Sequence, residues 1–226
     1  MLGRGLVAAG TDPWVRWDWV SRHTDTIRAA TRQHVELTVI AVGLGLVIAV
    51  PLALAARRWR WANTPVLSAT GILYTVPSLA LFAMLVPWTG LTRTTAEIGL
   101  VGYTLLILIR NIVTGLDAVP DDVREAARGM GLTGRQQLLR IEFPLAVPSI
   151  IAGIRIATVT TIGLVTVTAL IGQGGLGQLI LDGLIRDFRT PLVVGTVLSI
   201  ALAVVADVGL VGLERLITPW ARSRGK

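Results

Sequence analysis

The sequence predicts an all-α integral membrane protein with about five transmembrane helices. Of its 226 residues, 53% are hydrophobic and 15% are charged, and the mean hydropathy is +0.68, which leaves too little polar surface for a soluble domain of this size. The apolar residues form five stretches, each long enough to cross a hydrocarbon core of ~30 Å, which requires about 20 helical residues. One polar segment with a helical pattern separates two of these stretches, and we expect it to lie in the cytoplasm.

The formal net charge of +7 favours retention at the cytoplasmic membrane surface over nucleic-acid binding. The arginines are spread among short loops and are not gathered on one face. No disulfide framework can form, because the chain has no cysteine.

Residues 1–35 precede the first apolar stretch and contain three tryptophans and five arginines. This mixture suits either a helix in the lipid headgroup region or a flexible tail. The region has no apolar core of signal-peptide length, so the first span itself is expected to direct insertion. His23 and His34 are too far apart for a one-turn metal pair, and we expect both to be solvated.

The first three spans are predicted at residues 37–56, 65–88 and 95–115. Pro77 falls inside the second span and predicts a kink, because it frees a backbone carbonyl that protein or water must then satisfy. The kink either faces a cavity, where Tyr74 and Ser78 would line a translocation path with Pro77, or it is simply tolerated by packing. The third span carries Arg110 near its end.

The polar segment at 117–144 predicts two short helices bent at a glycine. Asp121 and Asp122 follow Pro120 and suit a helix N-terminus. Gly131 is a plausible left-handed stop, and Thr133 and Gln136 have the spacing of a capping box. Residues at three- and four-residue steps give the first helix a small apolar face, and a second apolar face runs on until Pro144 interrupts it; the first face consists of Val123, Ala126, Ala127 and Met130.

The last two spans are predicted at 146–171 and 191–217. Five threonines lie along the first of them, and their hydroxyls either bond to helix carbonyls or line a path, in which Thr161 and Thr168 would take part. The loop at 172–177 formally matches GxGxxG, but no strand precedes it, so a dinucleotide site is excluded.

An ion pair is predicted inside the membrane. Asp207 lies eight residues before Arg215, or ~12 Å inside the cytoplasmic end of its span. Arg155 is the first choice of partner and Arg110 the second, since both reach a similar depth on other helices. The alternative is that Arg155 extends to the headgroups while Asp207 is protonated or hydrated.

The spacing in the polar segment resembles the EAA loop of binding-protein-dependent ABC importer permeases. Every spaced position of that motif is met, with Phe143 where leucine is usual; the matching residues are Glu125, Ala126, Ala127, Gly131, Ile141 and Pro144. The longer run from 125 to 177 resembles the osmoprotectant permeases for glycine betaine, carnitine and choline. It contains the segments EAARGMG, FPLAVPSIIAGIR and LIGQGGLG, and YTVPSLALFAMLVPW and LERLITPW fit the same subfamily. The resemblance covers roughly residues 34–220.

This resemblance implies a MetI-like type I ABC importer fold with a permease domain at 36–220 and a basic cytoplasmic tail at 221–226. Two permease subunits, identical or homologous, would form the path through the lipid. Two separate ATPase subunits, which bind ATP and Mg²⁺, would dock on the EAA loop, and an extracytoplasmic binding protein would deliver the solute. The chain itself would hold no cofactor and no metal. The glycine loop would lie at the outer gate or form an ordinary tight turn, and its glycines are Gly172, Gly174, Gly175 and Gly177.

Three other functions compete with this one. An importer of the same kind for methionine or phosphonate is the nearest, because EAA and glycine-loop segments are shared more widely than the substrate. An ion-gradient-driven secondary transporter lacks support, since paired acidic residues within spans are missing. A membrane-embedded enzyme is disfavoured because the sequence has no Walker A, HExxH or GxSxG motif.

The distribution of arginine favours an outside N-terminus and a cytoplasmic C-terminus in a multi-pass protein of the cell membrane. The loops assigned to the cytoplasm carry more basic residues than those assigned outside. The five arginines of the N-terminal region oppose this orientation.

Overall fold

The structure is a computed structural model that describes residues 13–219, and all regular elements in this range are helical. In chain order they are α1 (Trp17–Arg22), α2 (Thr24–Arg58), α3 (Arg60–Thr75), α4 (Ser78–Thr89), α5 (Arg93–Asp117), α6 (Asp121–Gly129), α7 (Gly134–Gln137), a π-helical turn (Leu138–Glu142), α8 (Phe143–Val167), a 3₁₀ turn (Thr168–Ile171), α9 (Leu176–Ile185) and α10 (Arg189–Ile217).

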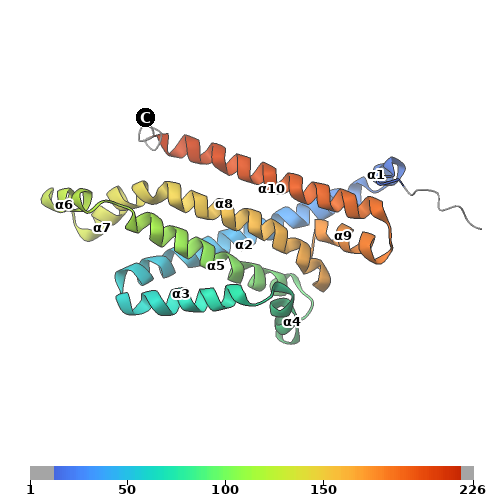
Figure 1. Cartoon of the computed structure of the whole chain (residues 1–226), viewed down its shortest axis with the longest axis horizontal. Coiled ribbons are helices and arrows are strands. Elements are labelled where there is room, and N and C mark those ends of the chain that lie inside the picture. The colour runs from blue at the N-terminus through green and yellow to red at the C-terminus, as the bar shows by residue number, and fades with distance from the viewer. Residues whose placement is uncertain (1–12, 220–226) are drawn as a thin grey trace, which may run out of the picture.

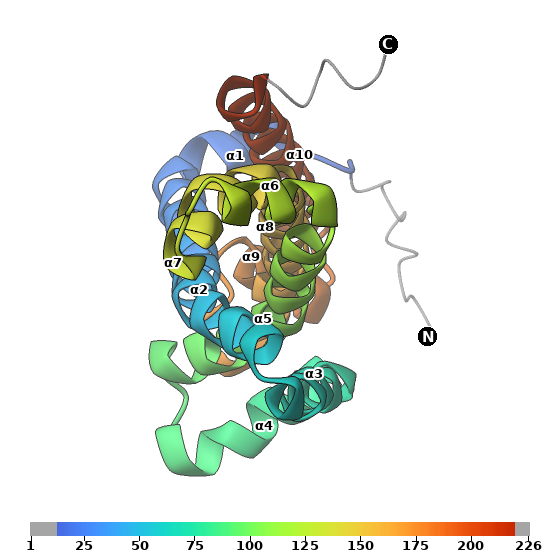
Figure 2. The same ribbon diagram turned by 90° about the vertical axis from the view of Figure 1, so that its left-hand side faces the viewer.

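Three long helices, α2, α5 and α8, pack together at the centre of the bundle (Figure 1). Helices α3 and α4 lie on one side of this centre, and α9 and α10 lie on the other (Figures 1 and 2). One core cluster joins the three central helices and consists of Ala49, Ala53, Leu108, Ile109, Ile112, Leu116, Ala146, Ile150 and Ala157. A second cluster, toward the other end, includes Leu37, Phe82, Leu100 and Val165.

Small residues let the central helices approach closely. A Cβ atom on Gly45 of α2 would lie 2.0 Å from Thr104 Oγ1 of α5. Likewise, a Cβ on Gly153 of α8 would lie 2.5 Å from the Cβ of Asn111 on α5. Membrane helices associate through such close contacts, because apolar side chains gain no hydrophobic free energy by moving from lipid to a helix interface.

By length and composition, the described chain has four helices able to cross a membrane, or five if the bent pair α3–α4 is one span. The predicted second span is therefore not a kinked helix. Its two halves meet at 97°, because Val76, which precedes Pro77, is extended and ends the helix. The Val76 carbonyl lies at this break and accepts a hydrogen bond from the Tyr103 hydroxyl, which satisfies it inside the protein.

The first span begins earlier than its apolar stretch predicts. Helix α2 starts at Thr24, so much of the region predicted as an interfacial helix or tail continues the first membrane helix. His34 lies within this helix and is fully buried, and its Nε2 donates to the Ile162 carbonyl at 3.0 Å. The prediction that His34 is solvated was wrong, because the helix begins well before residue 37, where the apolar stretch starts, and packs His34 into the bundle. Residues 1–12 and the predicted basic tail at 221–226 lie outside the described range.

The second short helix of the polar segment is not separate from the fourth span. Residues Gly134–Ile171 form one continuous helix, and Pro144 lies in the first turn of α8. A π-helical turn, Leu138–Glu142, precedes the proline and widens the helix where a backbone N–H is missing. The prediction that the second helix of the polar segment is short and separate from the fourth span was therefore wrong.

Candidate functional site

Helix α6 lies at one end of the bundle, beyond the ends of α5 and α8 (Figure 1). It begins at Asp121, with Pro120 as its N-cap, and it has two aspartates in its first turn. Gly131 has a φ of +77°, which glycine adopts without strain, and it turns the chain into α7. The predicted capping box is confirmed, since Thr133 and Gln136 bond reciprocally to each other's backbone N–H.

The two alanines of the EAA motif do not share one face. Ala127 is 1% exposed and packs against its own chain, whereas Glu125 and Ala126 are exposed. Met130 is 71% exposed. Only Ala126 therefore leaves room for a docking partner, and Ala127 lets α6 pack closely against the rest of the loop. Ile141 and Pro144 are half-buried and lie behind α6, on the continuous helix.

Glu142 holds the polar segment to the membrane helices and was not singled out in the sequence. Its side chain is 6% exposed, and its carboxylate accepts from Arg57 Nη1 of α2 at 2.5 Å and from Gln137 Nε2 of α7 at 2.7 Å. Arg124 of α6 approaches within 3.8 Å and also donates to the Leu116 carbonyl at the end of α5. One carboxylate thus joins α6 and α7 to the end of α2. An acid beside Phe143-Pro144 on an otherwise apolar face was the available signal.

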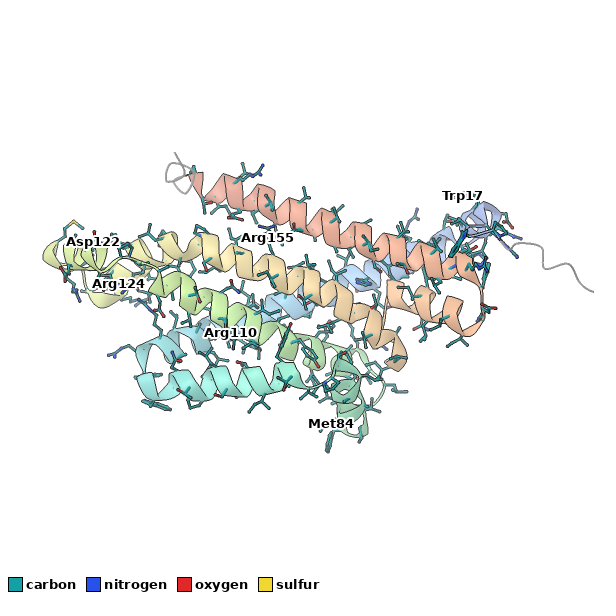
Figure 3. All side chains as sticks on the ribbon, viewed as in Figure 1. Trp17, Met84, Arg110, Asp122, Arg124 and Arg155 are labelled. Atoms are coloured by element: carbon teal, nitrogen blue, oxygen red, sulfur yellow. The ribbon has the colours of Figure 1, made fainter. Side chains whose placement is uncertain are left out.

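A basic hollow of 830 Å³ opens beside this junction. Four arginines line it together with Glu142, the only acidic residue among its lining residues. Figure 3 labels Arg124 and Asp122 on α6, at the same end of the bundle. The arginines that line the hollow are Arg57, Arg58, Arg128 and Arg135.

The glycine loop lies at the opposite end from α6 and packs tightly against its own chain (Figure 1). A Cβ on Gly175, which has a φ of +52°, would lie 2.8 Å from the backbone of His34. Added Cβ atoms on Gly174 and Gly177 would meet Ala169 and Thr166 backbone atoms at 2.5 Å. Gly172 has a φ of +76° and open space around it. Of the two predicted roles, these contacts favour the tight turn.

The structure brings Arg155 and Asp207 together. Arg155 Nε donates to Asp207 Oδ1 at 2.9 Å and Nη2 donates to Oδ2 at 3.2 Å, so the pair is bidentate. Glu214, about two helical turns further along α10, lies 3.6 Å from Arg155 Nη1. Figure 3 shows Arg155 between α8 and α10. Both side chains of the pair are half-buried, and Arg110, the second choice of partner, takes no part in it.

The predicted path residues separate into two groups. Tyr74 is 39% exposed, Pro77 is exposed and Ser78 is half-buried, all near the bend between α3 and α4. Thr161 and Thr168 are buried within the bundle, and Thr168 Oγ1 bonds to the Val165 carbonyl at 2.7 Å. Their position leaves only the first group facing outward from this chain. Among residues 13–219, no cluster of three or more histidine or acidic side chains could hold a metal ion.

Comparison with known sequences identifies related proteins over most of the chain. Residues 41–219 match the family described as the binding-protein-dependent transport system inner membrane component. The chain is 40% identical over 198 residues to the osmoprotectant import permease protein OsmW of Salmonella typhimurium, covering 85% of this chain and 92% of that one. It is 38% identical to the glycine betaine/carnitine/choline transport system permease protein OpuCB of Bacillus subtilis, covering 84% and 87% of the two chains.

Solved structures share the same fold. The methionine ABC transporter MetNI in an inward-facing conformation superposes with a TM-score of 0.78 at 19% identity, covering 87% of this chain and 98% of the matched one. An amino acid ABC transporter solved with histidines gives a TM-score of 0.70 at 17% identity, covering 89% and 98%.

Proposed function

Because the chain belongs to the family of binding-protein-dependent transport system inner membrane components, we propose that it is the transmembrane subunit of an ATP-driven importer for a compatible solute. The solute is a quaternary ammonium compound such as glycine betaine, carnitine or choline. The observation that carries this proposal is 38–40% identity, over more than four fifths of both chains, to permeases named for osmoprotectants. The methionine and amino acid transporters are under 25% identical and bear only on the fold.

The exposed face of α6 docks on a separate ATPase subunit. Glu125 and Ala126 face outward there, and the basic hollow beside them suits an acidic partner surface. Movement of the ATPase would reach the membrane helices through Glu142, which contacts α2 and lies on the helix continuous with α8. Two ATPases, each carrying ATP and Mg²⁺, would serve two permease subunits, identical or homologous.

The end of the bundle that carries α6 faces the cytoplasm in this proposal. The C-terminal end of α10 lies at that same end, and α1 and the glycine loop lie at the other (Figure 1). Five crossings, with the bent pair counted as one, then leave the N-terminus outside and the C-terminus inside. An extracytoplasmic binding protein would deliver the solute at the end formed by α1 and the glycine loop.

The direct test is uptake by the assembled importer. The chain would be coexpressed with a candidate ATPase subunit and solute-binding protein, reconstituted into proteoliposomes and supplied with radiolabelled glycine betaine, carnitine, choline or methionine. We expect uptake of at least one quaternary ammonium compound that requires both ATP and the binding protein. Uptake of methionine alone would assign the chain to a sibling importer. Uptake by the chain alone under an ion gradient would assign it to secondary transport.

A further inference from the structure

A groove of 740 Å³ lined by both polar and apolar side chains runs between α3 and α5 on the outside of this chain. Arg110 on α5 and Tyr74 on α3 line it, and Figure 3 labels Arg110 where α5 lies beside α3. The groove is also lined by further polar side chains of α3, namely Asn63, Thr64, Ser68 and Thr75. No acidic residue is among its lining residues.

This groove is unsuited to contact with lipid. Thr64, Ser68, Thr75 and Arg110 are all exposed. Arg110 lies on α5, which is long and apolar enough to cross a membrane, and the other three lie on α3, which forms a bent candidate span together with α4. Polar and ionisable side chains at membrane depth almost always face a bundle interior or a water-filled cavity, because hydrocarbon offers them no hydrogen bonds. The groove therefore faces the path between two permease subunits and not the surrounding bilayer.

Arg110 carries an uncompensated charge into this groove. Within residues 13–219, Arg110 has no ion-pair or hydrogen-bond partner, whereas Arg155 on α8 has two carboxylates within reach. Arg110 lies seven residues before the end of α5, or ~10 Å inside it. An unpaired guanidinium at this depth provides a strong site for a carboxylate, which it can bind through two parallel hydrogen bonds.

Tyr74 lines the same groove and packs against Tyr103 of α5, about two helical turns from Arg110. Tyr103 precedes Arg110 by seven residues on the same face of α5, ~10 Å along the helix, and the Tyr74 ring centroid lies 5.8 Å from that of Tyr103. The Cα–Cβ bond of a helical residue tilts toward the N-terminus, so Arg110 leans toward the tyrosines. Aromatic rings attract quaternary ammonium groups.

Building on the proposed function, we propose that this groove is a solute site in the path that selects zwitterions with both a quaternary ammonium and a carboxylate. Arg110 binds the carboxylate and Tyr74 contacts the ammonium group. Glycine betaine and carnitine have both groups, whereas choline has a hydroxyl in place of the carboxylate. The permease would thus prefer betaine-type solutes over choline, independently of the binding protein.

The absence of cysteine from the chain gives a direct binding measurement. Ser68→Cys places one thiol in the groove, and Ser21→Cys places a control thiol on exposed α1 at the opposite end. Maleimide labelling of this chain would be followed in the assembled importer without ATP, with glycine betaine or choline added. We expect glycine betaine to slow labelling at Ser68→Cys and not at Ser21→Cys. Choline should need about tenfold higher concentrations, since it lacks one charge-assisted hydrogen bond.

Substitution of Arg110 assigns this preference to its charge. Arg110→Gln in the Ser68→Cys background should abolish the difference between the two solutes, and Arg110→Lys should retain part of it. Equal protection by both solutes with Arg110 intact, or an unchanged difference in Arg110→Gln, overturns the inference. Unaltered labelling of Ser21→Cys in each variant reports that the fold is intact. If the importer takes up quaternary ammonium compounds while the labelling shows no preference, this inference fails alone. If it takes up none, the proposed function fails as well.

Discussion

The side chain of Glu142 contacts groups from α2, α6 and α7, and its replacement tests whether this junction holds the polar segment at 117–144 in place. Glu142→Gln should lower the free energy of unfolding by about 3 kcal/mol, because breaking a buried ion pair leaves its partner uncompensated. Arg57 keeps Asp117 at 3.0 Å, which limits the loss. Thermal unfolding of the purified chain in detergent measures the effect.

Asp25→Asn is the matched control for this measurement. The side chain of Asp25 is 98% exposed, and its contact with Arg28 is long, at 3.8 Å. Asp25→Asn should therefore leave the unfolding midpoint unchanged. Equal unfolding midpoints for Glu142→Gln and the unaltered chain would show that the junction contributes no stability.

The Arg155 pair predicts an ordered series of losses. Arg155→Gln leaves both Asp207 and Glu214 without their cation, whereas Asp207→Asn leaves Arg155 with Glu214 at 3.6 Å. We therefore expect Arg155→Gln to lower assembly and uptake more than Asp207→Asn does. The double variant should recover part of the loss, because no charge is then left alone. Membrane abundance and uptake would be measured for all three variants, and strictly additive losses would show that the two residues act independently.

At the scale of single residues, an ion pair could be predicted where both residues lie at the same depth in the membrane. It could not be predicted where distant parts of the chain meet only in the tertiary structure. A constant rise per residue places Arg155 and Asp207 at similar depths, and the cost of an unpaired charge in lipid then requires a partner. Glu142 draws Arg57 and Arg124 from distant parts of the chain, and no spacing in the sequence relates these three residues.

At the level of elements, α6 has an exposed face that includes Ala126 and a packed face that includes Ala127. Ala126→Trp should abolish solute-stimulated ATP hydrolysis while the chain still inserts, because Ala126 is exposed where a partner would approach. Ala127→Trp should lower the amount of folded chain, because Ala127 is buried against its own loop. ATPase assays and membrane abundance separate the two effects. Normal coupling in Ala126→Trp would contradict docking through this face.

Gly131 tests the bend between α6 and the following helix. Gly131→Val forces a β-branched residue into a φ of +77°, which is strained whatever space surrounds it. We expect uptake and solute-stimulated ATP hydrolysis to fall while membrane insertion persists. Gly129→Val, where an added Cβ meets nothing within 4 Å, is the control for bulk alone.

The glycine loop behaves as a packing element in this structure. Gly175→Leu should lower abundance and uptake in proportion, because its side chain would enter the backbone of α2 at His34. Gly163→Leu on α8, where an added Cβ meets nothing within 4 Å, should preserve abundance. Reduced uptake at full abundance in Gly175→Leu would instead assign the loop to gating.

The positions of most helices follow from their apolar lengths, but two junctions do not. Proline chemistry was visible at Pro77 and at Pro144, yet one ends a helix and the other is absorbed by a π-helical turn. The difference depends on neighbours: Tyr103 bonds to the Val76 carbonyl at the break before Pro77, and Glu142 anchors the turn before Pro144. Such support is tertiary and leaves no local pattern in the sequence.

For the molecule as a whole, the apolar composition predicts a membrane protein, and the spacing of the EAA motif predicts a permease subunit of an ABC importer. Which faces meet a second permease subunit could not be read, because an apolar helix shows the same pattern toward lipid and toward protein. The polar residues of α3 that line the groove indicate such a face only in the folded structure, where α5 lies beside α3 and brings Arg110 to the same groove.

The unbroken helix from Gly134 to Ile171 has a mechanical consequence. Its 38 residues extend about 57 Å, well beyond the thickness of the hydrocarbon core. It begins beside α6 and ends at the glycine loop, so it is long enough for its two ends to protrude from opposite sides of the membrane. Under the proposed function, a tilt imposed by the ATPase on the end beside α6 would displace the glycine-loop end in the opposite direction, so the two sides of the membrane would be coupled through one rigid element.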